Sequence, residues 1–122
     1  MGRKIEIKRA LETDDAPLTA PPAWTNSEVA TVNGVTVLHA GGGRLDGRWH
    51  RQDSDEFLLV LEGELTVEFE SSSLSAGPGE AILTSADERH RAAVPAACLL
   101  LSVEAVGMKR TERVSAPRLP VQ

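Results

Sequence analysis

The sequence predicts a single all-β domain, and three observations support this prediction. Short apolar or alternating segments recur along the chain with turn residues between them, which gives roughly eight to ten strands. No segment shows a helical apolar face longer than two turns. The length of 122 residues suits one domain with one core. We therefore expect a β-sandwich or β-barrel.

The strands of the expected barrel occupy residues 27–107, with an arm before them and a tail after them. In the arm, residues 1–26, charged and apolar residues alternate over 3–9 and predict an edge strand, and a proline-rich connector follows. Trp24 ends this connector and is interpreted as an anchor on the core, with stacking on a ligand as the alternative. The tail, residues 108–122, has no periodicity and is either mobile or lies across another subunit.

The first half of the barrel begins with a hairpin. Asn33-Gly34 separates two β-branched runs and is a strong two-residue turn signal. The triple glycine 41–43 is not followed by the Gly-Lys-Ser/Thr ending of a phosphate loop, and it predicts flexibility or a tight turn. The strand 57–61 is apolar on both faces, so something is expected to cover each face.

The second half continues with short strands. The alternation after Gly63 directs Leu65, Val67 and Phe69 inward, and residues 81–84 form a further strand. Residues 89–94 predict a strand that Pro95 ends, and residues 99–106 predict the last long strand. Between them Cys98 lies in an apolar run and is interpreted as an inert buried thiol rather than a nucleophile.

Composition and charge exclude several classes of partner. The net charge is -5 and aromatic residues make up 3% of the chain, so it lacks both the positive charge and the stacking surface of nucleic-acid binders. No apolar run reaches the roughly 18 residues of a membrane helix, and the first residues do not resemble a signal peptide. We expect a cytoplasmic protein without nucleic-acid or membrane partners.

Polar residues with metal-ligating side chains gather in two stretches. His50, Gln52 and Glu56 share one face of an extended segment if a local loop or bulge lies near Asp53. A second stretch, 79–90, ends in His90 after an apolar strand and a turn. We expect His90 to join the other three side chains.

These two stretches resemble the motifs of the cupin superfamily, in particular its small single-domain members. His50, Gln52, Glu56 and Gly63 follow the spacing of the first motif, with Gln52 in place of its second histidine and Gly47 closer to His50 than the motif has it. Gly79 to His90 follows the spacing of the second motif, with Ser85 in place of its proline and Asp87 in place of its glycine. The resemblance implies a jelly-roll β-barrel, the double-stranded β-helix.

The resemblance also implies a divalent metal at the mouth of the barrel, of the kind Fe, Zn, Mn or Ni. His50, Glu56 and His90 match the ligand positions, and Gln52 would be a weak ligand or would bind a metal-bound water. The alternative is a degenerate pocket in which the histidines only form hydrogen bonds. Asp87 is expected to tolerate the left-handed conformation of the glycine that it replaces.

Further pocket candidates are Arg48, Arg91 and His39. An anionic substrate could be oriented by one of the arginines near the motifs, a group that includes Arg51 and Arg89 besides Arg48 and Arg91. The alternative is plain surface charge, which is the more common role of arginine at strand ends. His39 either faces the pocket or caps a strand end.

Two functions stay open at this point. The first is an enzyme with dioxygenase or isomerase chemistry on a small organic molecule, and the second is a non-catalytic module that binds a small ligand or metal. The doubly apolar strand 57–61 and the N-terminal strand predict a homodimer with exchanged edges.

Overall fold

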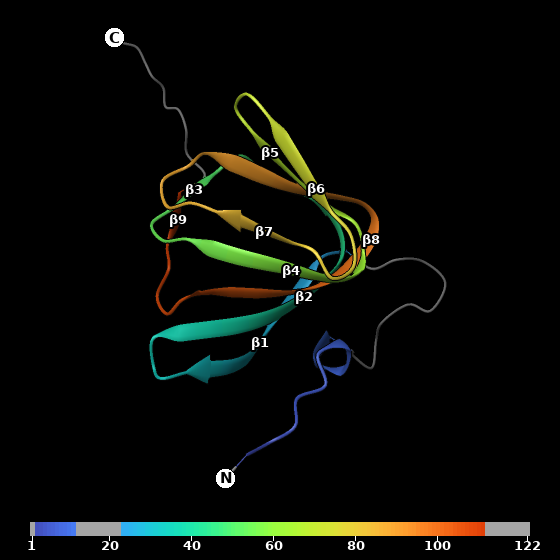
Figure 1. The fold of residues 1–122 in the computed structure, drawn as a ribbon, viewed down its shortest axis with the longest axis vertical. Coiled ribbons are helices and arrows are strands. Elements are labelled where there is room, and N and C mark those ends of the chain that lie inside the picture. The colour runs from blue at the N-terminus through green and yellow to red at the C-terminus, as the bar shows by residue number, and fades with distance from the viewer. Residues whose placement is uncertain (1, 12–22, 112–122) are drawn as a thin grey trace.

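The structure is a computed structural model, and it describes residues 2–11 and 23–111. The described residues form nine strands and one short 3-10 helix, which confirms the all-β prediction (Figure 1). The helix η1 spans Lys8–Leu11, and the strands are Thr25–Val32 (β1), Thr36–Asp46 (β2), Arg51–Gln52 (β3), Glu56–Gly63 (β4), Leu65–Phe69 (β5), Ser73–Ala76 (β6), Ala81–Thr84 (β7), His90–Ala105 (β8) and Arg110–Thr111 (β9). No helix in the described part of the chain is long and apolar enough to cross a membrane.

Strand β8 is the central strand of the barrel. It pairs antiparallel with β2, β4 and β5, and the main sheet runs β1-β2-β8-β4-β7 with β6 attached through β5. The curved sheet encloses a core whose central residues include Leu58, Val60, Leu65, Val67 and Leu100. Strands β3 and β9 form a separate two-stranded sheet at one end of the barrel (Figure 1).

Pro95 does not end a strand, contrary to the sequence prediction. Strand β8 continues through Pro95. Leu45 of β2 pairs with Val94, and Gly43 of β2 pairs with Cys98, so the pairing with β2 skips the residues between Val94 and Cys98. A bulge of this kind leaves the residues within it outside the hydrogen-bond ladder, where the missing N–H of proline costs nothing. The two predicted strands are therefore one long strand that bends at Pro95.

The triple glycine forms no turn and lies within β2. Gly41 and Gly42 are buried and paired with β8. A Cβ on Gly41 would lie 2.5 Å from Cζ2 of Trp24, and one on Gly42 would lie 2.7 Å from Cδ1 of Leu11. The missing side chains let Trp24 and Leu11 pack directly on the backbone of this strand.

The hairpin at Asn33-Gly34 is confirmed. Both residues have positive φ, 55° and 71°, as a type I′ turn requires, and they join β1 to β2. The inward direction of Leu65 and Val67 is also confirmed, because both side chains are buried in β5.

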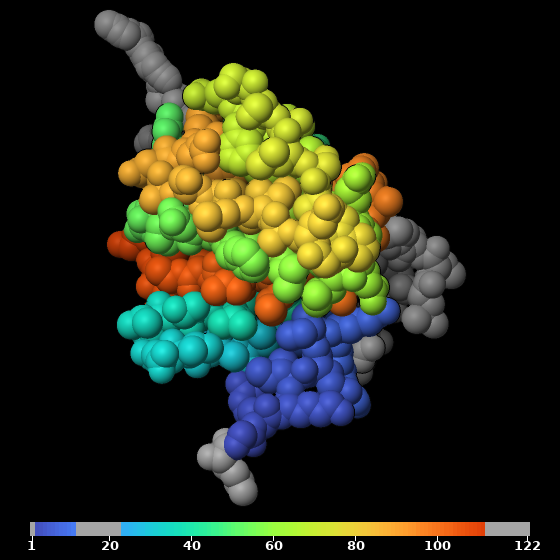
Figure 2. Space-filling view, viewed as in Figure 1, coloured from blue at the N-terminus to red at the C-terminus, as the bar shows by residue number. Residues whose placement is uncertain are grey.

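The N-terminal strand predicted over residues 3–9 is absent from the structure. Lys8–Leu11 forms the 3-10 helix η1, in which Ala10 N donates to the carbonyls of Glu6 and Ile7. The helix lies against β1 and β2, as the blue segment in Figure 2 shows. Alternation over a few residues was too short a signal to exclude a helical turn anchored by Leu11.

The outer face of β4 is exposed at Phe57 and partly buried at Leu59 and Leu61. Phe57 is 41% exposed and Leu83, its partner in register on β7, is 58% exposed, whereas Leu58 and Val60 on the inner face are buried. One face of this doubly apolar strand thus forms the core, and the other points outward.

The ends of the described barrel differ from the predicted range 27–107. β1 begins at Thr25, and Arg110–Thr111 pairs with β3, so residues just beyond Gly107 belong to the folded unit. The proline-rich connector and the tail beyond residue 111 lie outside the described residues.

Candidate functional site

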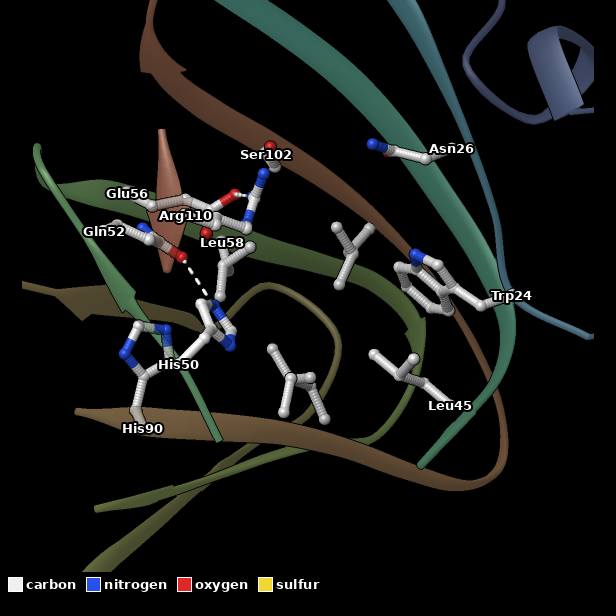
Figure 3. Close-up of a pocket in the computed structure, with 13 residues that line it drawn as sticks. Trp24, Asn26, Leu45, His50, Gln52, Glu56, Leu58, His90, Ser102 and Arg110 are labelled. Atoms are coloured by element: carbon white, nitrogen blue, oxygen red, sulfur yellow. Dashed lines mark hydrogen bonds and ion pairs between the residues drawn. The ribbon is translucent and has the colours of Figure 1, made fainter. Parts of the chain in front are cut away.

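The barrel contains a cavity of about 240 Å³ whose two ends differ in chemistry. Figure 3 shows Trp24 and Leu45 at one end and His50, His90 and Gln52 at the other. The lining residues are Trp24, Asn26, Leu45, His50, Gln52, Glu56, Leu58, Leu65, His90, Ala92, Leu100, Ser102 and Arg110. A small molecule with an apolar body and one polar group matches this division.

A backbone bridge brings the two histidines together. His50 N donates to the carbonyl of His90 and His90 N donates to the carbonyl of His50, each at 2.9 Å. The ring centroids lie 4.5 Å apart at an interplanar angle of 56°. The two sequence stretches therefore meet at one point of the cavity wall.

Both histidines are oriented in the same way. Nδ1 of His50 lies 2.9 Å from the carbonyl of Arg48, and Nδ1 of His90 lies 2.8 Å from the carbonyl of Glu88. Because a carbonyl only accepts, each Nδ1 carries the hydrogen, and Nε2 of each ring is left for another partner. Burial lowers the pKa of His90, so this imidazole is neutral at pH 7.

Gln52 lies beside His50 and is fully buried. Its Oε1 is 3.0 Å from Nε2 of His50, while its own amide nitrogen has no hydrogen-bond partner among the described residues. If the ring is neutral, the amide turns so that its nitrogen donates to Nε2, and its oxygen then lacks a partner. In either orientation one polar atom of Gln52 is available to a bound molecule.

Glu56 faces Glu104 and Arg110. Glu56 and Glu104 are opposite each other in the β4–β8 register, and both are buried. Nη2 of Arg110 lies 3.3 Å from Oε2 of Glu56 and 3.6 Å from Oε1 of Glu104, and Oγ of Ser102 donates to the same Glu104 oxygen at 3.3 Å.

One guanidinium faces two buried carboxyl groups, so their charges do not balance if both ionise. Burial, followed by the hydrogen bond from Glu104, raises the pKa of Glu56 to about 7, and the charge of Arg110 opposes this rise. Glu56 is therefore partly protonated near neutral pH.

Hydrogen bonds from the motif loops hold Arg110 in place. Asp53 N donates to the carbonyl of Lys109 at 3.1 Å, and Lys109 N donates to Oδ1 of Asp53 at 3.0 Å. Asp87 adopts a φ of 64°, which confirms that it tolerates the left-handed conformation expected at this turn, and its N–H donates to the carbonyl of Gln52 at 2.7 Å. The loop of the first motif is thus tied to the segment that carries Arg110, and the loop of the second motif to the strand that carries Gln52.

The other pocket candidates from the sequence do not line this cavity. Arg91 donates two hydrogen bonds to Glu68, each 3.1 Å long, and its guanidinium lies 5.9 Å from the ring centroid of Trp49. Arg48 contributes its carbonyl to His50 rather than a side chain to the lining. His39 lines a separate outer pocket, with its Nδ1 3.8 Å from Oε1 of Glu104.

The two remaining arginines make other contacts. Arg51 donates to the carbonyl of Asp87, and Arg89 lies 4.6 Å from the ring centroid of Trp49. Trp24 both packs against the core and lines the cavity, so its two interpretations are compatible.

Sequence reasoning missed Arg110, Glu104 and Ser102. The last two carried a usable signal, because in the apolar strand 99–106 they are polar residues two apart and therefore share a face. Arg110 carried none, since it follows a glycine turn in a segment without periodicity. Cys98 is buried and burial raises the pKa of its thiol to about 11, as an inert thiol requires.

The described residues contain no group of three or more His, Cys, Asp or Glu side chains arranged to hold a metal ion. The rings of His50 and His90 lie side by side, but the carboxyl group of Glu56 forms an ion pair with Arg110.

Comparison with solved structures shows the same fold. The chain is similar to the polyketide cyclase RemF from Streptomyces resistomycificus, with a TM-score of 0.71 and 17% identity over 96% of this chain and 88% of that one. It is also similar to protein NMB1881 from Neisseria meningitidis, with a TM-score of 0.67 and 23% identity over 84% and 99% of the two chains. An uncharacterized conserved protein with a double-stranded β-helix domain from Klebsiella pneumoniae gives a TM-score of 0.67 at 16% identity, over 91% and 93%.

These likenesses establish the double-stranded β-helix that the sequence predicted. No curated protein matches the chain. The family model for the cupin domain matches residues 34–104, which include both motif stretches and most of the barrel. The chain therefore belongs to the cupin domain family.

Proposed function

We propose that this chain binds a small organic molecule in the barrel cavity and moves a proton on it, as an isomerase does. The molecule's apolar part would lie against Trp24 and Leu45, and its carbonyl or hydroxyl group would face His50, Gln52 and His90. The name of one similar structure, a polyketide cyclase, supports a small-molecule role for the barrel.

One observation carries the choice of proton transfer. Glu56 lines the cavity, and its pKa of about 7 matches the operating pH of a general acid or base. The neutral imidazole of His90 can accept a hydrogen bond at Nε2 from the hydroxyl group of an enol, and the amide of Gln52 offers a second polar atom beside it. Removal of a proton beside a carbonyl and its return at another atom requires no further reactant.

A divalent metal is the cofactor that family membership suggests, because cupins often bind one. The residues in this chain do not fit the expected centre. Gln52 replaces one imidazole, and Glu56 shares its carboxyl group with Arg110 and Glu104. A metal that used this carboxylate would have to displace the guanidinium and overcome its repulsion. We therefore route no step of the reaction through a metal.

Deuterium exchange tests the proposal. The protein is incubated in D2O with a panel of small ketones, β-diketones and hydroxy acids, and incorporation at carbon is followed by NMR, with thermal shift as the binding readout. We expect exchange for at least one bound compound and loss of at least tenfold in rate in Glu56→Gln. Glu64→Gln, an exposed carboxyl outside the site, is the control and should leave the rate unchanged.

The same measurements identify the alternative function. Compounds that raise the melting temperature without exchanging deuterium would identify a non-catalytic binding module and contradict the isomerase proposal. Exchange that persists in Glu56→Gln would contradict the role given to this carboxyl group.

We also propose a homodimer that uses the outer face of β4 and β7. Phe57 and Leu83 are exposed side by side there, although no exchanged N-terminal strand contributes. Light scattering should give twice the 13.1 kDa chain mass, and Leu83→Asp should give the single mass. A 13.1 kDa species for the unmodified chain would contradict this proposal.

A further inference from the structure

The positive charge in the wall of the barrel cavity is already used by the protein. Among the described lining residues Arg110 carries the guanidinium, which lies 3.3 Å from Oε2 of Glu56 and 3.6 Å from Oε1 of Glu104. If one of these carboxyl groups holds a proton, the other still matches the guanidinium, and if both are ionised the three groups together are negative. In neither state does Arg110 have positive charge to spare for a bound anion.

The two histidines of the wall offer an acceptor to a bound molecule. Both ring nitrogens of His50 have partners, because Nδ1 lies 2.9 Å from the carbonyl of Arg48 and Nε2 lies 3.0 Å from Oε1 of Gln52. Nδ1 of His90 donates to the carbonyl of Glu88 at 2.8 Å, so Nε2 of the neutral ring is an acceptor. A molecule that meets this atom has to donate a hydrogen, which a hydroxyl group can do and a carboxylate cannot.

The opposite end of the cavity suits an uncharged ring. Trp24 and Leu45 line this end together with Asn26, whose amide carries no charge (Figure 3). The indole packs directly on Gly41, where a Cβ would lie 2.5 Å from its Cζ2, and this contact restrains it. An aromatic ring placed against an indole gains stability beyond the area that it buries. The cavity volume of about 240 Å³ lies below the roughly 300–1,000 Å³ of pockets for drug-sized ligands, so we expect one ring rather than a fused pair.

We propose that the cavity selects uncharged one-ring molecules that carry a hydroxyl group, and that it excludes carboxylates of the same size. The ring lies against Trp24, and the hydroxyl group donates to Nε2 of His90. Together with the carbonyl group that the proposed proton transfer requires, these features define aryl hydroxy ketones as the substrate class. The choice of a carbonyl compound rests on the proposed function, whereas the selection by charge and by hydrogen bonding concerns binding alone.

Three probes that share a benzoyl group test this selection in the full-length protein. α-Hydroxyacetophenone carries a hydroxymethyl group on the carbonyl carbon, propiophenone has a methyl group in place of the hydroxyl, and benzoylformate carries a carboxylate. Their dissociation constants are measured at pH 7.5 by calorimetry and ligand-observed NMR. We expect the hydroxy ketone to bind roughly tenfold more tightly than either of the others.

Each probe can contradict one part of the proposal. Benzoylformate that binds as tightly as the hydroxy ketone would overturn the exclusion of carboxylates. Propiophenone that binds as tightly would overturn the hydrogen bond to His90. Absence of binding by all three probes would overturn the substrate class. This comparison uses the wild type alone, so it decides the proposal even where a variant fails to fold.

Variants at the polar end test the role of charge. Glu104→Gln removes one of the two carboxyl groups that face Arg110, so benzoylformate should bind about threefold more tightly than to the wild type. Glu64→Gln, which removes an exposed carboxyl group outside the site, is the matched control and should leave its affinity unchanged. An unchanged affinity for benzoylformate in Glu104→Gln would contradict the explanation by charge.

Variants at the apolar end test the contact with the ring. Trp24→Leu should weaken the binding of α-hydroxyacetophenone about fivefold, and it should weaken the cyclohexyl analogue of this ketone less. Trp49→Phe changes the other tryptophan, which lies outside the lining of the cavity, and should leave both affinities unchanged. Equal losses for the two ketones in Trp24→Leu would overturn the aromatic contact.

Deuterium exchange separates this inference from the proposed function. Selective binding of α-hydroxyacetophenone without exchange at its hydroxymethyl carbon would overturn the proposed function and leave the selection standing. Exchange of a carboxylate or an acyclic ketone, without selective binding of the hydroxy ketone, would overturn the selection and leave the proposed function standing.

Discussion

The carboxyl group of Glu56 should make the stability of this protein depend on pH. Its pKa rises from 4.5 to about 7 in the folded protein because of burial and its bond with Glu104. Each pKa unit corresponds to about 1.36 kcal/mol, so this group is linked to about 3 kcal/mol of the free energy of unfolding. Since the folded state holds the proton more tightly than the unfolded state, this stabilisation is complete below about pH 4.5. It is lost as the pH rises through about 7.

Glu56→Gln isolates this contribution, because glutamine resembles the protonated acid and does not titrate. The free energy of unfolding in urea, followed by tryptophan fluorescence, is compared between variant and wild type from pH 4.5 to 8. We expect the variant to gain about 3 kcal/mol relative to the wild type over this range. Glu64→Gln, on the exposed side of the barrel, should show no such gain. A constant difference between Glu56→Gln and the wild type would refute the reasoning about the buried pair.

Four further predictions concern other parts of the structure. Arg110→Gln should lower the free energy of unfolding by about 1–3 kcal/mol at pH 8 and by less at pH 5, while Lys109→Gln, which removes an exposed charge from the same segment, should have little effect. Zinc or nickel titration by calorimetry should show weak binding to the wild type and tighter binding to Arg110→Gln, and a stoichiometric metal in the purified wild type would contradict this. Gly41→Ala should destabilise by about 1–3 kcal/mol in urea unfolding and change the Trp24 fluorescence, since its Cβ would overlap the indole, whereas Gly2→Ala should do neither. Cys98 should react with a thiol reagent at pH 8 only after unfolding, and rapid reaction of the native protein would contradict its burial.

The sequence was informative where local chemistry decides the structure. Asn33-Gly34 requires positive φ at two successive residues, and few conformations other than a hairpin turn offer that. Alternation over 64–70 fixed which side chains face the core, because a strand has only two faces. The motif spacing predicted that His90 lies near His50. In the structure a backbone bridge joins the two residues and holds their rings side by side.

Features that depend on distant contacts could not be predicted in this way. Pro95 is tolerated because β2 and β8 pair around it, and that register is not visible in the residues next to it. The glycines of β2 are explained by Trp24 and Leu11, which reach them from another part of the chain. Arg110 reaches the site through the hydrogen bonds between Lys109 and Asp53 and through the pairing of β9 with β3, all of which join distant parts of the chain.

Arg110 changes the interpretation of the motif that led to the site. In the centre that the family resemblance implies, a metal would supply positive charge to the carboxylate at the position of Glu56. Here a guanidinium supplies that charge, and it serves Glu104 as well as Glu56. One positive charge does not balance two ionised carboxyl groups, so the charges favour one bound proton. A divalent ion would balance both carboxylates and would favour loss of that proton. The presence of Gln52 where the motif has a second histidine also disfavours a metal. It removes a strong metal ligand and adds a neutral hydrogen-bonding group beside His50. The two departures from the motif are therefore consistent with each other, and both favour a site that holds a proton.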